Sequence, residues 1–218
     1  ECGRCTVVCP TTITHKPLIP RDLSIALRDH LNSSAKEIIG DPGTGAGKPA
    51  RELAGDVIAE DVIWACTSCR WCEEACPIFI SYVDRIVEMR RHLVLEKATF
   101  PEEAEPAFRG MEVNGNPWQL AAETRADWAS GLGVPLAAEG GSFEYLFWVG
   151  CAGSFDDAGK RTSQAFARLL QRAGVSFAIL GPEETCTGDA ARRLGNEYLF
   201  QTLAQANVEM LNRYGVKR

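Results

Sequence analysis

Seven of the nine cysteines lie in two short runs whose spacing suits a metal cluster. The complete run separates its cysteines by two, two and three residues and ends in proline: Cys66, Cys69, Cys72, Cys76 and Pro77. Bacterial [4Fe–4S] sites have this spacing, because three neighbouring thiolates can wrap one side of a cubane. A residue before proline avoids the α region, so we expect the fourth sulfur to point toward a neighbouring cluster.

The chain opens inside a second run of the same kind, in which Cys2, Cys5 and Cys9 precede Pro10. A first cysteine would lie three residues before Cys2, so we expect the chain to be a fragment or a processed piece. The fourth cysteine of such a run ligates the other cluster in two-cluster proteins. We therefore expect cluster one to take Cys66, Cys69, Cys72 and Cys9. We expect cluster two to take Cys2, Cys5 and Cys76, with its fourth ligand outside the chain.

Zinc is the main alternative for these cysteines. Zinc sites commonly use two Cys-x2-Cys pairs separated by a spacer, and they need neither a third nearby cysteine nor a Cys-Pro ending. The spacing therefore favours clusters over a zinc-structured interaction module. A disulfide scaffold is expected in a shorter secreted chain with paired cysteines, whereas nine is an odd number.

Cys151 and Cys186 form a weaker pair, which we take as a candidate third site. Each follows an apolar run, and two parallel strands would bring both sulfurs to the carboxyl edge of a sheet, where α/β folds bind ligands. Cys186 also precedes a predicted helix, whose N-terminus favours a thiolate or an anionic cluster. The alternative is that both are buried apolar cysteines.

No residues are predicted to act as catalytic acid, base or nucleophile. The three histidines are scattered, and no Ser/His/Asp or Cys/His constellation occurs. The glycine-rich residues 40–49 are not a phosphate-binding loop, because Pro42 and Pro49 occupy its first glycine and hydroxyl positions. We expect a linker there.

Helices are expected to position the first two sites. Apolar residues recur at helical spacing around Leu23–Leu31, 51–65 and 81–97, and Ser81 is a candidate cap for the third helix. Residues 1–98 are therefore predicted to form an all-helical dicluster ferredoxin domain. Residues 99–142, rich in Pro, Gly and Glu, are predicted to be a connector with one short helix near 121–130.

Strands and helices alternate in the rest of the chain. The predicted elements are strand 146–149, helix 160–173, strand 177–180 and helix 190–214. Ala165, Leu169 and Leu170 are expected on the inner face of the first helix. This βαβα pattern, with strands apolar on both faces, predicts an α/β domain over residues 143–218 that the chain end cuts short. The fold class is thus α+β in two parts.

Composition limits the range of partners. The net charge of −6 and the pI near 5.2 argue against a nucleic-acid surface, which needs a basic stripe. The longest uncharged apolar stretch, Tyr145–Phe155, is too short to span a bilayer.

These residues together resemble the heterodisulfide-reductase-related iron–sulfur proteins, which join a helical dicluster domain to a cysteine-rich "CCG" domain. The resemblance is carried by the two cysteine runs and by Gly150–Gly153, Glu184–Asp189 and Arg192–Glu197. These last segments are similar to the membrane-bound electron-transfer-flavoprotein:menaquinone oxidoreductase branch.

The resemblance implies an iron–sulfur oxidoreductase in which this chain performs electron transport. It implies a flavoprotein donor, a quinone or a membrane segment as acceptor, and a place on the cytoplasmic side of a membrane, held by segments outside this chain. It also implies a third iron–sulfur cluster at Cys151 and Cys186. Thr187 stands where the family has a paired cysteine. This argues against the alternative of a disulfide-type reductase with a catalytic cluster in the CCG domain.

Overall fold

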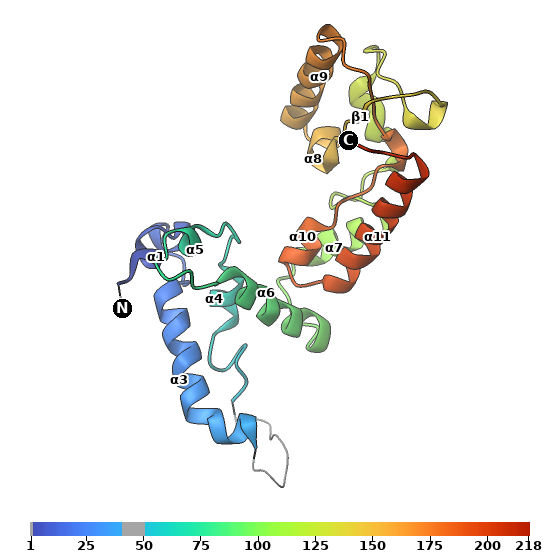
Figure 1. Ribbon diagram of the computed structural model, residues 1–218. Helices are drawn as coiled ribbons and strands as arrows, with labels where there is room; N and C mark the ends of the chain where they lie inside the picture. The colour runs from blue at the N-terminus through green and yellow to red at the C-terminus, as the bar shows by residue number, and fades with distance from the viewer. Residues whose placement is uncertain (1, 41–50) are drawn as a thin grey trace. The chain divides into compact units, whose positions relative to one another are not determined.

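The computed structural model describes residues 2–40 and 51–218 and divides into two compact units. Unit 1 runs to Pro101 and includes Arg193–Asn196, and unit 2 comprises Glu102–Arg192 and Glu197–Arg218. Figure 1 follows the chain from the blue helices of unit 1 to the red helix at the end of unit 2. Most of the linker predicted at 40–49 lies outside the described residues.

Unit 1 is built from helices in the described part of the chain. Its elements are α1 (Arg4–Val7), α2 (Pro10–Ile13), α3 (Pro20–Ile39), α4 (Glu60–Trp64), α5 (Trp71–Glu74), α6 (Val83–Arg91) and the π-helical turn η1 (His92–Glu96). The two longest helices supply its core, in which Leu23 of α3 packs with Ile86, Met89 and Leu93. Cys5 and Cys72 are part of the same buried cluster, so the cysteine runs are built into the core.

The helix predicted over residues 51–65 is shorter in the structure and begins only at Glu60. Gly55 has a φ of +101°, and the Asp56 carboxylate accepts a hydrogen bond from the Glu52 amide at 2.9 Å. Local side-chain bonds of this kind compete with helical ones. The helix predicted over 81–97 is confirmed as α6 and η1, although Ser81 donates to the Asp84 carboxylate rather than capping a backbone amide.

Unit 2 combines helices with a small sheet. Its elements are α7 (Ala104–Asn114), the 3-10 turns η2 (Ala122–Ala129), η3 (Ala137–Glu139) and η4 (Gly181–Glu183), strands β1 (Tyr145–Leu146) and β2 (Phe177–Ala178), and helices α8 (Gly150–Phe155), α9 (Asp157–Arg172), α10 (Asp189–Arg193) and α11 (Glu197–Arg213). The predicted two-part α+β class is confirmed, with more helix than sheet.

The two predicted strands pair in parallel, with Tyr145 opposite Phe177 and Leu146 opposite Ala178. Each is only two residues long, because the chain turns into α8 at Gly150 and into η4 at Gly181. Phe177 and Ala178 are both buried, as expected for a strand covered on both faces. Parallel pairing carries the chain out of both strands at one edge of the sheet, the edge at which Cys151 and Cys186 follow.

Residues 102–142, expected to belong to a connector, lie within unit 2. The 3-10 turn η2 confirms the short helix near 121–130, and its residues Arg125 and Trp128 are buried. Trp128 packs with Phe177 and Ile179 in the core of the unit. Trp128, from a stretch of polar composition, therefore packs against strand β2.

Two predicted helices of unit 2 differ in detail from the structure. The inner face of α9 carries Ser163 and Ala167, whereas Ala165 is exposed and Leu169 is 62% exposed, so the predicted inner face is wrong at both positions. The helix predicted over 190–214 breaks into α10 and α11 around Gly195, which has a φ of +88°. A Cβ at Gly195 would lie 2.5 Å from the Arg90 carbonyl carbon, so only glycine fits this turn. In the described part of the chain, no helix has the length and apolarity to cross a membrane.

Candidate metal centres

The two cysteine runs of unit 1 fold in the same way. In Cys2-x2-Cys5 and in Cys69-x2-Cys72, the residue after the first cysteine is left-handed, Gly3 with a φ of 69° and Arg70 with a φ of 61°. A one-turn helix then carries the second cysteine, Cys5 in α1 or Cys72 in α5. Gly3 adopts this conformation without strain, whereas Arg70 is held there by contacts of its guanidinium to Glu73 and Asp84.

One cavity of unit 1 brings together cysteines from both runs. It is lined by Cys9 from the first run and by Cys66, Cys69 and Cys72 from the second. Leu18, Leu23 and Ile86 complete much of its wall. These four cysteines are the set that the sequence assigns to cluster one.

A second cavity gathers the remaining cysteines of the two runs. Its lining includes Cys2 and Cys5 from the first run and Cys76 from the second, together with Arg4, Arg21 and Arg28. The three cysteines are the predicted ligands of cluster two that lie within the chain. Tyr82 lines both cavities.

Hydrogen bonds reach sulfur atoms in both cavities. In the first, Thr11 Oγ1 lies 2.8 Å from Cys9 Sγ, and the Ser68 amide donates to Cys66 Sγ at 3.4 Å. In the second, the Tyr82 hydroxyl donates to Cys5 Sγ at 3.3 Å, and the Ile80 amide donates to Cys76 Sγ at 3.3 Å. Such bonds stabilise negative charge on sulfur and tune the potential of a bound cluster.

Burial and hydrogen bonds act in opposite directions on the pKa values of the thiols in the first cavity. Burial raises the pKa of Cys66 and raises the pKa of Cys72 to about 12. Burial also pushes the pKa of Cys9 upward, but hydrogen bonds from Thr11 and Thr12 outweigh it and leave that pKa below its usual value. Buried thiols that resist ionisation need a positive charge beside them, which an iron–sulfur core supplies when thiolates coordinate it.

No three His, Cys, Asp or Glu side chains of the described residues stand in a geometry that could hold a single metal ion. The fit to an iron–sulfur core is carried by the chemistry of the donors. Each cavity is lined by several thiols from two runs of cluster spacing, and all of these cysteines are free.

Unit 2 contains Cys151 and Cys186, the two cysteines of the predicted third site. Cys151 lies in α8 directly after β1, and Cys186 follows η4 after β2. A hydrogen bond between them lowers the pKa of Cys186 to about 6 and raises the pKa of Cys151. The Gly188 amide also donates to Cys186 Sγ at 3.4 Å.

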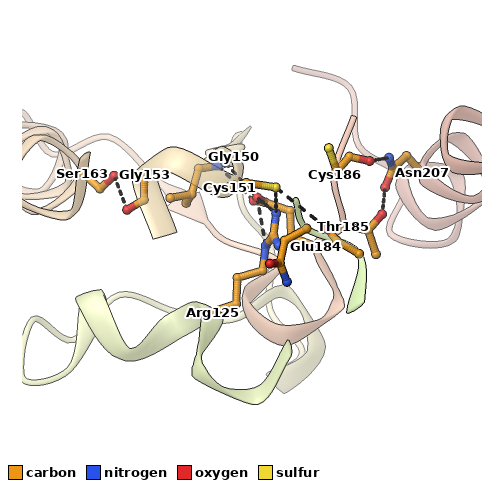
Figure 2. Close-up of polar contacts among 12 residues, drawn as sticks. Arg125, Gly150, Cys151, Gly153, Ser163, Glu184, Thr185, Cys186 and Asn207 are labelled. Carbon is orange, nitrogen blue, oxygen red and sulfur yellow. Dashed lines mark hydrogen bonds and ion pairs between the residues drawn. The ribbon is translucent and has the colours of Figure 1, made fainter. Parts of the chain in front are cut away.

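A buried ion pair lies beside Cys151 (Figure 2). Arg125 donates from Nη2 to Cys151 Sγ at 3.1 Å and to Glu184 Oε1 at 3.2 Å. The side chains of Arg125 and Glu184 are 2% and 1% exposed. The amides of Val149 and Gly150 also donate to the Glu184 carboxylate, at 2.9 and 2.8 Å. Burial raises the pKa of Glu184, and these hydrogen bonds oppose that rise.

The backbone around Cys186 is fixed from two sides. Its amide donates to the Gly115 carbonyl at 2.7 Å, and its carbonyl accepts from Asn207 Nδ2 at 2.9 Å. Asn207 in turn accepts from the Thr185 hydroxyl at 2.8 Å, as Figure 2 shows. The cysteine therefore sits on a loop whose polar groups are satisfied, which fixes the direction of its sulfur.

Sequence reasoning missed Arg125, Asn207 and Tyr82 as site residues. Arg125 lies in a stretch whose composition indicates a connector, and nothing in its local pattern distinguishes it from a surface arginine. Asn207 falls on the apolar side of a helix, where a lone amide is a weak signal of a structural role. Only five residues lie between Cys76 and Tyr82 in the sequence, and this proximity was the one signal that the tyrosine lies near a ligand.

Comparison with known families matches both parts of the chain. A model for a 4Fe–4S dicluster domain matches residues 1–80, and a model for a cysteine-rich domain, the CCG domain, matches residues 145–218. The prediction of two [4Fe–4S] clusters is therefore confirmed. No solved structure matches the chain.

Three curated proteins place the chain among its relatives. It is 44% identical over 240 residues to the EtfAB:quinone oxidoreductase of Syntrophomonas wolfei, with 100% of this chain and 34% of that protein covered. It is 41% identical over 252 residues to the probable iron-sulfur-binding oxidoreductase FadF of Bacillus subtilis, with 100% and 36% covered. It is 29% identical over 229 residues to one subunit of the dihydromethanophenazine:CoB--CoM heterodisulfide reductase of Methanosarcina barkeri, with 100% and 52% covered.

The chain thus spans about a third of the length of the first two relatives. Its similarity to them and to the heterodisulfide reductase runs through both matched domains. The chain belongs to the heterodisulfide-reductase-related iron–sulfur oxidoreductases, in which a 4Fe–4S dicluster domain is joined to a cysteine-rich domain.

Proposed function

We propose that the dicluster unit is an electron relay whose cluster ligands cross between the two cysteine runs. Cluster one takes Cys9, Cys66, Cys69 and Cys72. Cluster two takes Cys2, Cys5 and Cys76, with a fourth ligand from outside this chain. One observation carries this proposal: the seven cysteines sort into two cavities, and each cavity contains the Cys-Pro cysteine of the other run.

The two clusters are neighbours in this arrangement, because the ring of Tyr82 forms part of both cavity walls. When bound, each cluster supplies one-electron redox chemistry. The chain contributes burial of the ligands and hydrogen bonds to their sulfurs, which set the potentials. No side chain needs to act as an acid or a base in such a relay.

The donor in this proposal is a flavoprotein dehydrogenase, and the acceptor is a quinone. The similarity to an EtfAB:quinone oxidoreductase supports this direction of flow. Because quinones reside in membranes, the unit would work at the cytoplasmic face of a membrane, held there by segments that are not part of this chain.

Pairs of cysteine substitutions in the full-length protein test the crossed ligand sets. Cys9→Ser with Cys66→Ser removes two ligands of one cluster, so the other cluster keeps its EPR signal. Cys9→Ser with Cys5→Ser removes one ligand from each cluster, so both signals change. The protein is purified anaerobically, and each variant is reduced before EPR and iron analysis.

The two double variants act as controls for each other, because each removes two thiols from unit 1. If the ligands came from single runs, the results would be exchanged: the Cys5 and Cys9 pair would spare one cluster and the Cys9 and Cys66 pair would damage both. That outcome would refute the crossed arrangement.

A third centre at Cys151 and Cys186 is a second proposal, favoured by the hydrogen bonds that Cys151 Sγ accepts from the Arg125 guanidinium and Cys186 Sγ accepts from the Gly188 amide. Its remaining ligands would come from outside this chain. Cys151→Ser in the full-length protein should then lower the iron content while leaving the two dicluster signals unchanged. Unchanged iron would contradict a third cluster. Retained disulfide-reducing activity dependent on Cys186 would instead favour the reductase alternative.

A further inference from the structure

Arg90 is a buried cation bonded to the backbone of Cys66, which lines the first cysteine cavity. It lies in the last turn of α6 and is 3% exposed. Burying a charge is costly unless it is compensated, and buried arginines are commonly paired with carboxylates. The partners of this guanidinium therefore indicate what compensates it.

The guanidinium hydrogen-bonds only neutral groups among the contacts observed in the described residues. It donates to the Ile63 carbonyl at 2.8 Å, to the Trp64 carbonyl at 3.3 Å and to the Arg193 carbonyl at 2.8 Å. Its central carbon also lies 5.2 Å from the centre of the Trp64 ring. No carboxylate of the described residues forms an ion pair with it.

The remaining contact of Arg90 leads to a predicted ligand of cluster one. Nη2 donates to the Cys66 carbonyl at 2.7 Å, and Cys66 is one of the four cysteines that line the first cavity. The carbonyls of Ile63 and Trp64 belong to the C-terminal end of α4, which a neutral amide could satisfy as well. Capping alone therefore does not account for a full positive charge at this position.

We infer that Arg90 is a positioning residue that raises the reduction potential of cluster one by holding a buried positive charge behind its ligand Cys66. This inference rests on the proposed ligand set. Reduction adds one electron, and hence one negative charge, to the cluster. A fixed cation close to a ligand stabilises the reduced form more than the oxidised form, and burial leaves its field unscreened by salt.

Cluster two lacks such a buried cation among the described residues of its cavity. The arginines that line it, Arg4, Arg21 and Arg28, are not buried. Arg21 and Arg28 also pair with the neighbouring Asp22 and Asp29 carboxylates. Water, salt and these carboxylates weaken their fields, so removing Arg90 should affect the two clusters unequally.

Redox titration followed by EPR on the full-length protein tests this inference. Cys69→Ser first identifies the signal of cluster one. Arg90→Gln should then lower the reduced-to-oxidised ratio of cluster one at a fixed potential by on the order of tenfold, which is about 59 mV for a one-electron couple. The potential of cluster two should stay unchanged. Arg90→Lys, which keeps the charge, should leave both potentials near their original values.

Arg85→Gln is the matched control, because Arg85 is an exposed arginine on the same helix. It should shift neither potential. Loss of cluster one alone in Arg90→Gln, with both clusters kept in Arg90→Lys, would also support the inference, because it would show that cluster one needs the cation.

Three results would overturn the inference. Equal shifts or equal loss of both clusters would indicate a structural role, and so would a shift in Arg90→Lys as large as in Arg90→Gln. An unchanged potential in Arg90→Gln would refute the effect directly while leaving the relay proposal intact. Absence of two reducible clusters in the unsubstituted protein would refute the relay proposal and this inference with it.

Discussion

At the scale of single residues, the cysteine sites differ in how their sulfurs are stabilised. In the cavity proposed for cluster one, Cys66 receives a hydrogen bond from the Ser68 amide and Cys9 shares one with the Thr11 hydroxyl, and both partners are close in sequence. In cluster two, Cys5 receives its bond from Tyr82, which is 77 positions away. The near contacts follow from the motif itself, whereas the distant one depends on the packing of α6 against the first run.

Tyr82→Phe should lower the potential of cluster two. The substitution removes the hydroxyl that donates to Cys5 Sγ and keeps the ring that both cavities share. A hydrogen bond to sulfur stabilises the more negative reduced cluster, so its loss favours the oxidised form. EPR-monitored titration should show this shift in cluster two and not in cluster one. A shift confined to cluster one would contradict the assignment of Cys5.

Arg125→Met should destabilise unit 2 strongly. It leaves the Glu184 carboxylate buried without its cation, and breaking a buried pair in this way costs about 3–5 kcal/mol. Adding Glu184→Gln should recover part of that loss, since the two residues are coupled. Urea denaturation measures both effects, with exposed Arg168→Met expected to change the free energy of unfolding by less than about 0.5 kcal/mol. Additive losses in the double variant would argue against the pair.

At the scale of elements, sequence periodicity placed the long helices well and the short ones poorly. The Leu23–Leu31 spacing predicted α3, in which Leu23 and Leu27 pack in the core and Leu31 is exposed. In α9, Ser163 and Ala167 face inward and Leu169 faces out, because a short side chain at the closest approach to α8 allows tight packing. Hydrophobicity alone cannot predict such a face.

The loop before η2 is positioned by its close packing against the segment that carries Cys186. Gly115 has a φ of +65°, and a Cβ there would lie 3.2 Å from Thr185, next to the loop that carries Cys186. The Gly115 carbonyl accepts from the Cys186 amide at 2.7 Å. This glycine therefore holds two segments together that are about 70 residues apart in sequence, a contact typical of long-range packing that spacing does not reveal.

Gly115→Ala should destabilise unit 2 by about 1–3 kcal/mol, from left-handed backbone strain and the contact with Thr185. Gly131→Ala is the matched control, because Gly131 has a φ of +75° but open space around its Cβ position. The control should show the strain without the contact and so cost less. Chemical denaturation followed by circular dichroism measures both, and equal losses would mean that the contact contributes nothing.

At the scale of the whole molecule, the sequence predicted the two-part α+β fold and the presence of two clusters. Seven cysteines in two matching runs predicted two clusters, because cluster spacing is local in sequence. The buried charges Arg90 and Arg125 could not be predicted. Each is buried by partners more than 20 residues away, and an arginine in a helical pattern ordinarily indicates an exposed position.

The chain forms one part of a longer electron path in the proposed relay. The family match shows two clusters, and the seven cysteines of unit 1 line two cavities that share Tyr82. Such an arrangement is useful only if electrons enter and leave through partners. The relay therefore requires that electrons pass from a flavoprotein through the two clusters to a quinone.

Rapid mixing of the full-length protein with a reduced electron-transferring flavoprotein tests that claim most directly. We predict that both cluster signals appear by freeze-quench EPR and then disappear when a menaquinone analogue is added, and that Cys69→Ser slows both steps. Clusters that dithionite reduces but the flavoprotein does not, or clusters that stay reduced in the presence of the quinone, would contradict the relay.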